Sequence, residues 1–138
     1  MDTKLMPRLI AVDDNGDSAE LIIRVAKTCG YSTRMMTDAR SLGDMLKQND
    51  ADVITLDLSM PDVDGIKTLD LLRDAGFRGH LIIISGHREF IREHACEVAK
   101  TNGLKVAGHL DKPVPLQALR ELLKSLNVVV GADESRSP

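Results

Sequence analysis

Three aspartates are the residues of this sequence best suited to chemistry on a charged group. Asp13 and Asp14 directly follow one short apolar run, and Asp57 ends another. A hydroxyl, Ser85, and an ammonium, Lys112, follow two further apolar runs. A buried charge without a partner is costly, so Asp57 at the end of an apolar run needs either solvent or a group that receives it.

This combination of residue types favours the transfer of a phosphoryl group. Three neighbouring carboxylates repel one another, and a hard divalent cation such as Mg²⁺ relieves that repulsion. A carboxylate can also attack phosphorus and form an aspartyl phosphate. A lysine, together with a hydroxyl or backbone donors, then meets the charge of the transferred group. One aspartate would be the nucleophile and two would hold the metal.

The reactive residues meet only if the chain alternates between strands and helices. Apolar runs predict strands at residues 8–12, 31–36, 53–56, 81–84 and 104–110. Apolar residues at helical spacing predict helices at residues 17–29, 38–48, 66–76, 89–100 and 116–126. Such an alternation predicts an α/β fold, a single doubly wound parallel sheet of five strands with helices on both faces.

The expected sheet also predicts where the site lies. Ligands of such sheets bind outside the carboxyl ends of the strands. If the strand order is 2-1-3-4-5, all the candidate residues reach one small cleft at that edge. The domain is expected to cover residues 1–126, and residues 127–138 are expected to form a polar tail or linker stub, disordered from Gly131.

Composition excludes several classes of function. The chain has 138 residues, enough for one domain, and 43% of them are hydrophobic. With 18 basic and 21 acidic residues and no basic block, nucleic-acid binding by this chain alone is not expected. No apolar run approaches the roughly 20 residues of a membrane span, and no signal peptide is recognisable. We therefore expect a soluble cytoplasmic protein in which Cys29 and Cys96 are free thiols.

The order of the motifs resembles the receiver domains of two-component response regulators. The resemblance covers residues 8 to about 126 and is carried by VDDN, DLSMPDVDG, the Ser85–Gly86 pair after III, and Lys112–Pro113. It implies a flavodoxin-like receiver fold and a phosphorylation-dependent switch. Such a domain catalyses its own phosphorylation and slow dephosphorylation, and is a signalling module rather than a metabolic enzyme.

The resemblance also implies a role for each acidic residue. By position, Asp57 resembles the phosphoacceptor, and Asp13 and Asp14 resemble the acidic pair around Mg²⁺. Asp57 would also contact the metal, and the backbone carbonyl of Ser59 would be a further ligand.

The remaining motif residues would act on the phosphoryl group. Ser85 matches the hydroxyl that swings onto it, and Gly86 matches the small residue that leaves room beside it. Lys112 matches the lysine of the family, and its bond to Pro113 is expected to be cis.

Two departures from the family bear on signalling. His109 stands where receivers usually have Tyr or Phe, so the usual aromatic switch is not expected. The segment between Ser85 and Lys112 is about a helical turn longer than is common, which predicts a longer fourth helix. This segment looks most like receivers fused to EAL-type cyclic-di-GMP phosphodiesterase domains.

Several partners and alternatives stay open at this point. The resemblance implies a histidine kinase or phosphotransfer protein as phosphoryl donor. The output would be a fused EAL-type domain, a separate partner or a second copy of the chain. A flavodoxin-like FMN-binding module and an aspartyl-phosphate phosphatase are the alternatives, although the phosphatase needs an acid where Ser59 stands. Asp13 or Asp14 could instead cap the helix that follows them.

Overall fold

The computed structural model describes residues 6–38, 41–48, 51–58, 65–86 and 89–136. Its strands are β1 (Arg8–Val12), β2 (Ser32–Met36), β3 (Val53–Asp57), β4 (His80–Ser85) and β5 (Lys105–Asp111). Its helices are α1 (Gly16–Thr28), α2 (Leu42–Gln48), α3 (Gly65–Asp74), α4 (Glu89–Thr101) and α5 (Leu116–Arg136).

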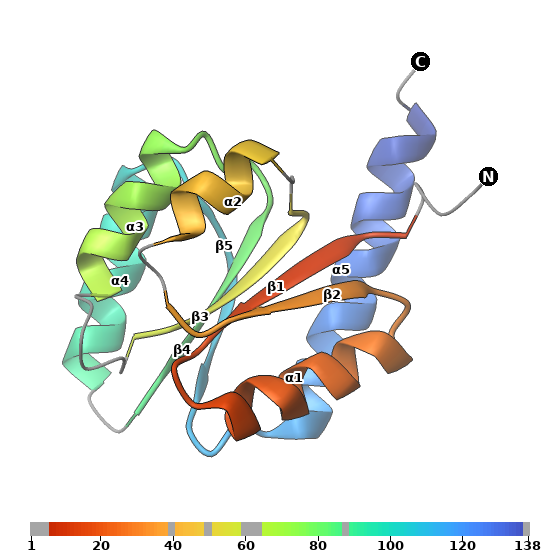
Figure 1. Ribbon diagram of the computed structural model, residues 1–138, viewed down its shortest axis with the longest axis horizontal. Helices are drawn as coiled ribbons and strands as arrows, with labels where there is room; N and C mark the ends of the chain where they lie inside the picture. The colour runs from red at the N-terminus through yellow and green to blue at the C-terminus, as the bar shows by residue number, and fades with distance from the viewer. Residues whose placement is uncertain (1–5, 39–40, 49–50, 59–64, 87–88, 137–138) are drawn as a thin grey trace.

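The strands form one parallel sheet in the order β2-β1-β3-β4-β5 (Figure 1). Helices α1 and α5 cover one face, and α2, α3 and α4 cover the other. The predicted doubly wound fold and its strand order are therefore confirmed. In this order β1 and β3 are neighbours, so the residues that follow them meet at the carboxyl edge of the sheet.

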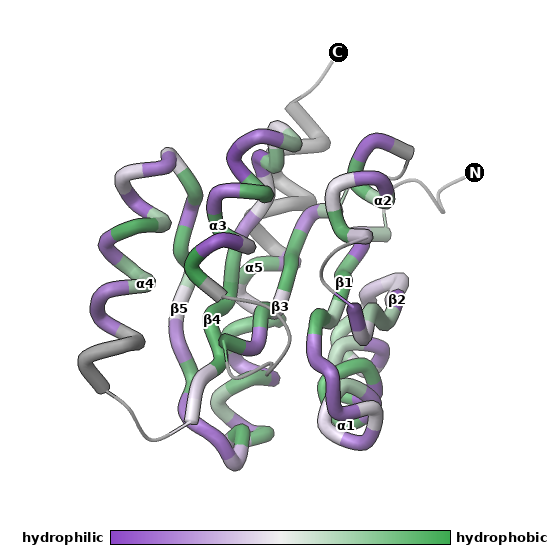
Figure 2. The backbone as a smooth tube through the Cα atoms, turned by 60° about the vertical axis from the view of Figure 1, so that its left-hand side comes forward, coloured by the Kyte–Doolittle hydropathy of each residue, from purple (hydrophilic) through white to green (hydrophobic). Residues whose placement is uncertain are grey.

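The central strands are apolar because both of their faces are covered. All residues of β3 are buried, as are all residues of β4 except its first. Ile54 and Leu56 pack in the layer of α2, α3 and α4, whereas Val53 packs in the layer of α1 and α5. Figure 2 shows the consequence, hydrophobic residues along the central strands and mixed hydropathy along the outer helices. A polar residue within β3 is therefore enclosed by protein.

Helix α1 begins with a side-chain cap from Asn15. The Asn15 side chain accepts hydrogen bonds from the backbone N–H groups of Asp17 and Ser18 at 3.0 and 3.1 Å. These bonds satisfy two N–H groups that have no partner within the helix. The alternative that Asp13 or Asp14 caps this helix is wrong, and both carboxylates are left for other contacts.

Helix α5 is longer than the sequence suggested. It extends to Arg136, so the disorder expected from Gly131 is wrong for residues 131–136. A glycine within a helix costs only about 1 kcal/mol relative to alanine, and the first proline after Pro115 is Pro138. The division between domain and tail at residue 126 stays a prediction. In the described part of the chain, neither α5 nor any other helix could cross a membrane.

Cys29 and Cys96 are not joined in a disulfide, as predicted. Cys29 is buried with α1 and α5, whereas Cys96 packs in the layer of α2, α3 and α4. The sheet lies between the two layers, so this fold does not pair them.

Candidate functional site

The register of the sheet brings Asp13 and Asp57 together. Val12 of β1 pairs with Leu56 of β3, so the next residue of each strand reaches the same edge. The backbone N–H of Asp13 also donates to the carbonyl of Met36 at 3.0 Å, which ties it to the end of β2. Side chains alternate along a strand, so both aspartates point toward the α1 and α5 side of the sheet.

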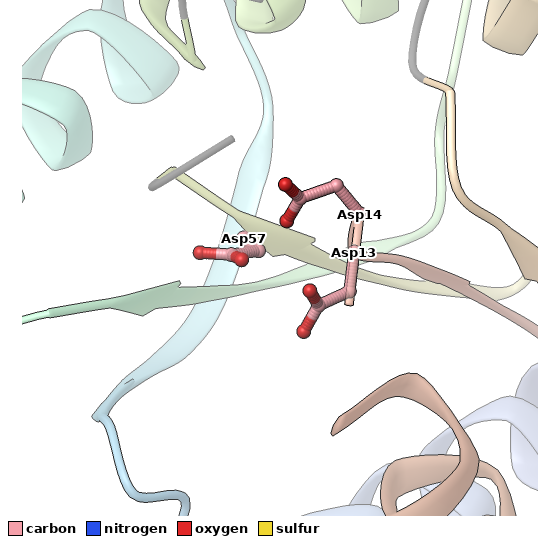
Figure 3. Close-up of side chains that lie close together, drawn as sticks. All are labelled: Asp13, Asp14 and Asp57. Carbon is pink, nitrogen blue, oxygen red and sulfur yellow. The ribbon is translucent and has the colours of Figure 1, made fainter. Parts of the chain in front are cut away.

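The three predicted acids form one cluster. Oxygens of the Asp13, Asp14 and Asp57 carboxylates all lie within 4.8 Å of one another (Figure 3). Asp13 and Asp57 are each only 1% exposed, whereas Asp14 is exposed. In Figure 3, Asp13 and Asp14 extend to opposite sides of the chain after β1. The cluster therefore has a buried part and an open side.

Lys112 provides the positive charge that the buried acids require. Its Nζ lies 2.7 Å from Oδ2 of Asp57 and 3.5 Å from Oδ2 of Asp13. The backbone N–H of Lys112 donates to the carbonyl of Ser85 at 2.8 Å, which fixes the loop after β5 beside the end of β4. The Lys112–Pro113 peptide bond is cis, as predicted. The contact with Lys112 explains how the buried strand β3 can end in a carboxylate.

The charges of the cluster shift two pKa values. Burial raises the pKa of Asp13, and the charge of Asp57 raises it further, against the lowering effects of the Asn15 N–H and of Lys112. Partial burial alone would lower the pKa of Lys112, but the hydrogen bond and charge of Asp57, with a contribution from Asp13, raise it overall. Ionisation of Asp13 is therefore less favourable than that of an ordinary aspartate, and the charged form of Lys112 is favoured.

The acid cluster fits a divalent cation. Oδ1 of Asp13 accepts the N–H of Asn15 at 2.9 Å, but Oδ2 is buried and has no hydrogen-bond partner. Carboxylate oxygens are the ligands that Mg²⁺ prefers, and the exposed Asp14 leaves space for the water ligands it retains. The predicted fourth ligand, the carbonyl of Ser59, lies outside the described residues.

Ser85 and Gly86 lie next to this cluster. The pairing of Asp57 with Ile84 places the end of β4 beside the end of β3, and the N–H of Leu58 donates to the Ile84 carbonyl at 2.9 Å. Ser85 is buried, and its hydroxyl donates to the carbonyl of Gly86 at 3.4 Å. A bond this long is weak and is easily exchanged for a stronger acceptor.

His109 lies away from the acids, on β5. It is exposed and lines a groove of about 460 Å³ between α4 and β5, with Cys96, Val106, Glu93, Glu97, Lys100 and Gly108. The residue at the usual aromatic position is thus part of an outer surface. Its role in signalling stays a prediction.

Sequence reasoning missed two residues near the site. Asn15 both caps α1 and donates its N–H to Asp13, and its type and position before a helix could have indicated this. Thr55 is buried two residues before Asp57. No sequence signal pointed to it, because a threonine is ordinary in a strand.

The comparisons with known proteins agree with this geometry. A family model described as the response regulator receiver domain matches residues 9–126. The chain belongs to this family. The receiver is 26% identical to a response regulator of known crystal structure from Colwellia psychrerythraea, with a TM-score of 0.78 over 90% of this chain and 98% of that one.

Two curated relatives of the receiver differ in length. The response regulator MprA of Mycolicibacterium vanbaalenii is 28% identical over 93% of this chain, which spans only 55% of that protein. The polar-differentiation response regulator DivK of Brucella anthropi is 24% identical over 87% of this chain and 96% of its own length. Similar receivers thus occur both within longer proteins and nearly alone.

Membership of the family sets the class of function. Receiver domains belong to two-component systems and interact with histidine kinases or phosphotransfer proteins. They generally bind Mg²⁺ at an acidic pocket, and this chain has an aspartate cluster of that kind. The FMN-binding and phosphatase alternatives have no support from the family match.

Proposed function

We propose that this receiver accepts a phosphoryl group on Asp57 and thereby changes the surface it presents to a partner. The observation that carries the proposal is the position of Lys112, whose ammonium contacts the buried carboxylates of both Asp57 and Asp13. A lysine placed there neutralises the nucleophile before the reaction and the new phosphoryl oxygens after it.

The transfer forms one bond and breaks another. A carboxylate oxygen of Asp57 attacks phosphorus, and an O–P bond forms as the bond between phosphorus and the donor's histidine nitrogen breaks. The electron pair of that bond stays on the nitrogen. Lys112 and the Ser85 hydroxyl then donate to the phosphoryl oxygens, with Gly86 leaving room for them. The weak bond of Ser85 to a carbonyl makes this exchange easy.

The metal would be held by the carboxylates of Asp13, Asp14 and Asp57, with the Ser59 carbonyl as a ligand implied by the family. When bound, Mg²⁺ supplies charge neutralisation for the transferring group. Oδ2 of Asp13 supports this assignment, because it is a buried acceptor with no hydrogen-bond partner and only the 3.5 Å ion-pair contact with Lys112.

The output is a separate part of the proposal. Phosphorylation would act through the surface of α4, β5 and α5, which includes His109. A fused EAL-type domain, a separate partner or a homodimer would receive the signal in the cytoplasm. The EAL-type fusion rests on sequence resemblance alone. The coding sequence after Pro138 tests it, since a stop codon there rules out the fusion and a frame encoding an EAL-type domain supports it.

Phosphorylation is tested by the intact mass of the chain after incubation with acetyl phosphate. We expect one phosphoryl group in the presence of Mg²⁺ and none with a chelator. Asp57→Asn should fold and stay unlabelled, because it removes the nucleophile with little change in volume. Asp17→Asn, an identical change of an exposed aspartate on α1, should be labelled like the wild type. Equal labelling of Asp57→Asn contradicts the assignment.

A further inference from the structure

A threonine hydroxyl lies buried beneath the acid cluster. Thr55 is on β3, two residues before Asp57, and is only 1% exposed. Residues two apart on a strand share a face and lie about 6.6 Å apart along it. The Thr55 side chain therefore lies next to that of Asp57 along β3, one side-chain position further into the sheet, on the α1 and α5 side. Thr55 pairs across the sheet with Ala11 and Ile82.

The Thr55 hydroxyl and one oxygen of the acid cluster each lack a hydrogen bond. Among the described residues, Thr55 Oγ1 and Asp13 Oδ2 are the two buried side-chain oxygen or nitrogen atoms that have no hydrogen-bond partner. Asp13 is two residues beyond Ala11, so it stands above the β1 partner of Thr55 and on the same face. A buried donor without an acceptor thus lies one side-chain position from a buried carboxylate oxygen whose only positive neighbour is Lys112, at the long distance of 3.5 Å.

Threonine is common in strands, but at this buried position its hydroxyl carries a cost that a purely structural role does not require. Leaving a buried hydroxyl unpaired destabilises a fold, and valine has nearly the same shape without that penalty. The other residues of β3 before Asp57 are apolar, namely Val53, Ile54 and Leu56. A hydroxyl at this one position, on the face that carries the acids, is therefore best explained by a contact with them.

We infer that Thr55 is a positioning residue for phosphoryl transfer, an inference that rests on the proposed function. Its hydroxyl donates to a water molecule between the two layers, and this water donates to Oδ2 of Asp13. A buried water needs two to four polar partners, and these two groups would supply two of them. The bridge fixes the direction of the Asp13 carboxylate, and thereby its spacing from Asp57 and the affinity of the cluster for Mg²⁺.

A matched pair of variants separates the hydroxyl from the shape of the side chain. Thr55→Val keeps the shape and removes the hydroxyl, whereas Thr55→Ser keeps the hydroxyl and removes a methyl group. Calorimetry measures Mg²⁺ affinity of the unphosphorylated chain, urea denaturation measures metal-free stability, and acetyl phosphate labelling measures the transfer rate. Because residues that orient metal ligands contribute about 10- to 100-fold, we expect about 10-fold weaker Mg²⁺ binding and slower labelling in Thr55→Val.

The two variants should rank in the opposite order for stability and for Mg²⁺ affinity. Thr55→Val should be at least as stable as the wild type, and Thr55→Ser should be less stable yet retain wild-type Mg²⁺ affinity. Wild-type Mg²⁺ affinity in Thr55→Val overturns the inference, as does failure of that variant to fold. Equal losses of affinity in both variants also overturn it, because the methyl group would then be responsible.

A double variant tests whether Thr55 acts through Asp13. In an Asp13→Asn chain, adding Thr55→Val should weaken Mg²⁺ binding no further, since the carboxylate it positions is gone. An undiminished 10-fold loss there would refute the bridge. If the wild type binds Mg²⁺ but is not labelled on Asp57, the proposed function fails while the Mg²⁺ affinities still decide the role of Thr55.

Discussion

Asp13→Asn should stabilise the metal-free receiver even though it removes a residue of the site. At an effective dielectric constant of about 20, two charges 4.8 Å apart repel by about 3 kcal/mol, so Asp13 and Asp57 repel at least this strongly. The 3.5 Å contact with Lys112 offsets this by about 5 kcal/mol. Burial of the ionised carboxylate adds a penalty of several kcal/mol. The sum of these three contributions disfavours the ionised form of Asp13, which agrees with its raised pKa.

The substitution removes the charge and keeps the shape. The amide oxygen of the new side chain can still accept the Asn15 N–H, and its NH₂ group can donate to the Asp57 carboxylate. Because the contact with Lys112 is lost as well, we expect a gain of about 1–2 kcal/mol in the free energy of unfolding at pH 7. Urea denaturation followed by circular dichroism, with a chelator present, measures it.

The pH dependence of this gain has a defined sign. The pKa of Asp13 is raised above its ordinary value of 3.8, so the stability linked to this group is present below that value. It is lost as the pH rises through the raised pKa of the folded chain. The advantage of Asp13→Asn should therefore be absent in acid and complete at neutral pH. Added Mg²⁺ should reduce or reverse it, because the metal stabilises the wild type more.

A control separates this effect from helix stability. Asp17→Asn removes a charge from the first turn of α1, where a negative charge is favourable, so it should be neutral or slightly destabilising. Destabilisation of the metal-free chain by Asp13→Asn at neutral pH would refute this prediction. Repulsion between the acids would then not lower the stability of the fold.

Three further predictions concern other contacts. Tyr31→Phe should lower the free energy of unfolding by about 1–3 kcal/mol, because the buried hydroxyl of Tyr31 donates to an α5 carbonyl at 2.6 Å; unchanged urea denaturation would contradict this. Gly79→Ala should cost about 1–3 kcal/mol by the same assay, since the new Cβ would lie 2.5 Å from the carbonyl oxygen of Asp52. Lys112→Ala should slow labelling by acetyl phosphate strongly, whereas His109→Ala, on an outer surface, should change partner or dimer contacts instead; equal losses of rate would overturn that division.

The site was predictable because its residues end apolar runs in a regular alternation. Parallel strands carry their carboxyl ends to one edge, so the sequence alone predicts that Asp13, Asp57 and Lys112 lie close together. The distances between these side chains could not be predicted, because the contact of Lys112 with Asp13 depends on the conformation of the loop after β5. The unpaired hydroxyl of Thr55 was also out of reach, since hydrogen-bond satisfaction depends on neighbours from other strands.

The main error concerned the end of the chain. Residues 131–136 suggested a polar tail because Ala132 is their only apolar side chain. The helix of α5 nevertheless continues to Arg136, since a helix already nucleated propagates residue by residue when no proline interrupts it. Polarity alone did not distinguish an extended helix from a disordered segment.

We propose that Asp57 is the residue that carries the phosphoryl group. Borohydride reduces an acyl phosphate to an alcohol, so treatment of the labelled chain followed by peptide mass spectrometry identifies the residue that was modified. We expect reduction of Asp57 alone, dependent on Mg²⁺ and on acetyl phosphate. Reduction at Asp13 or Asp14, or of no aspartate in a chain that carries the phosphoryl mass, would contradict it.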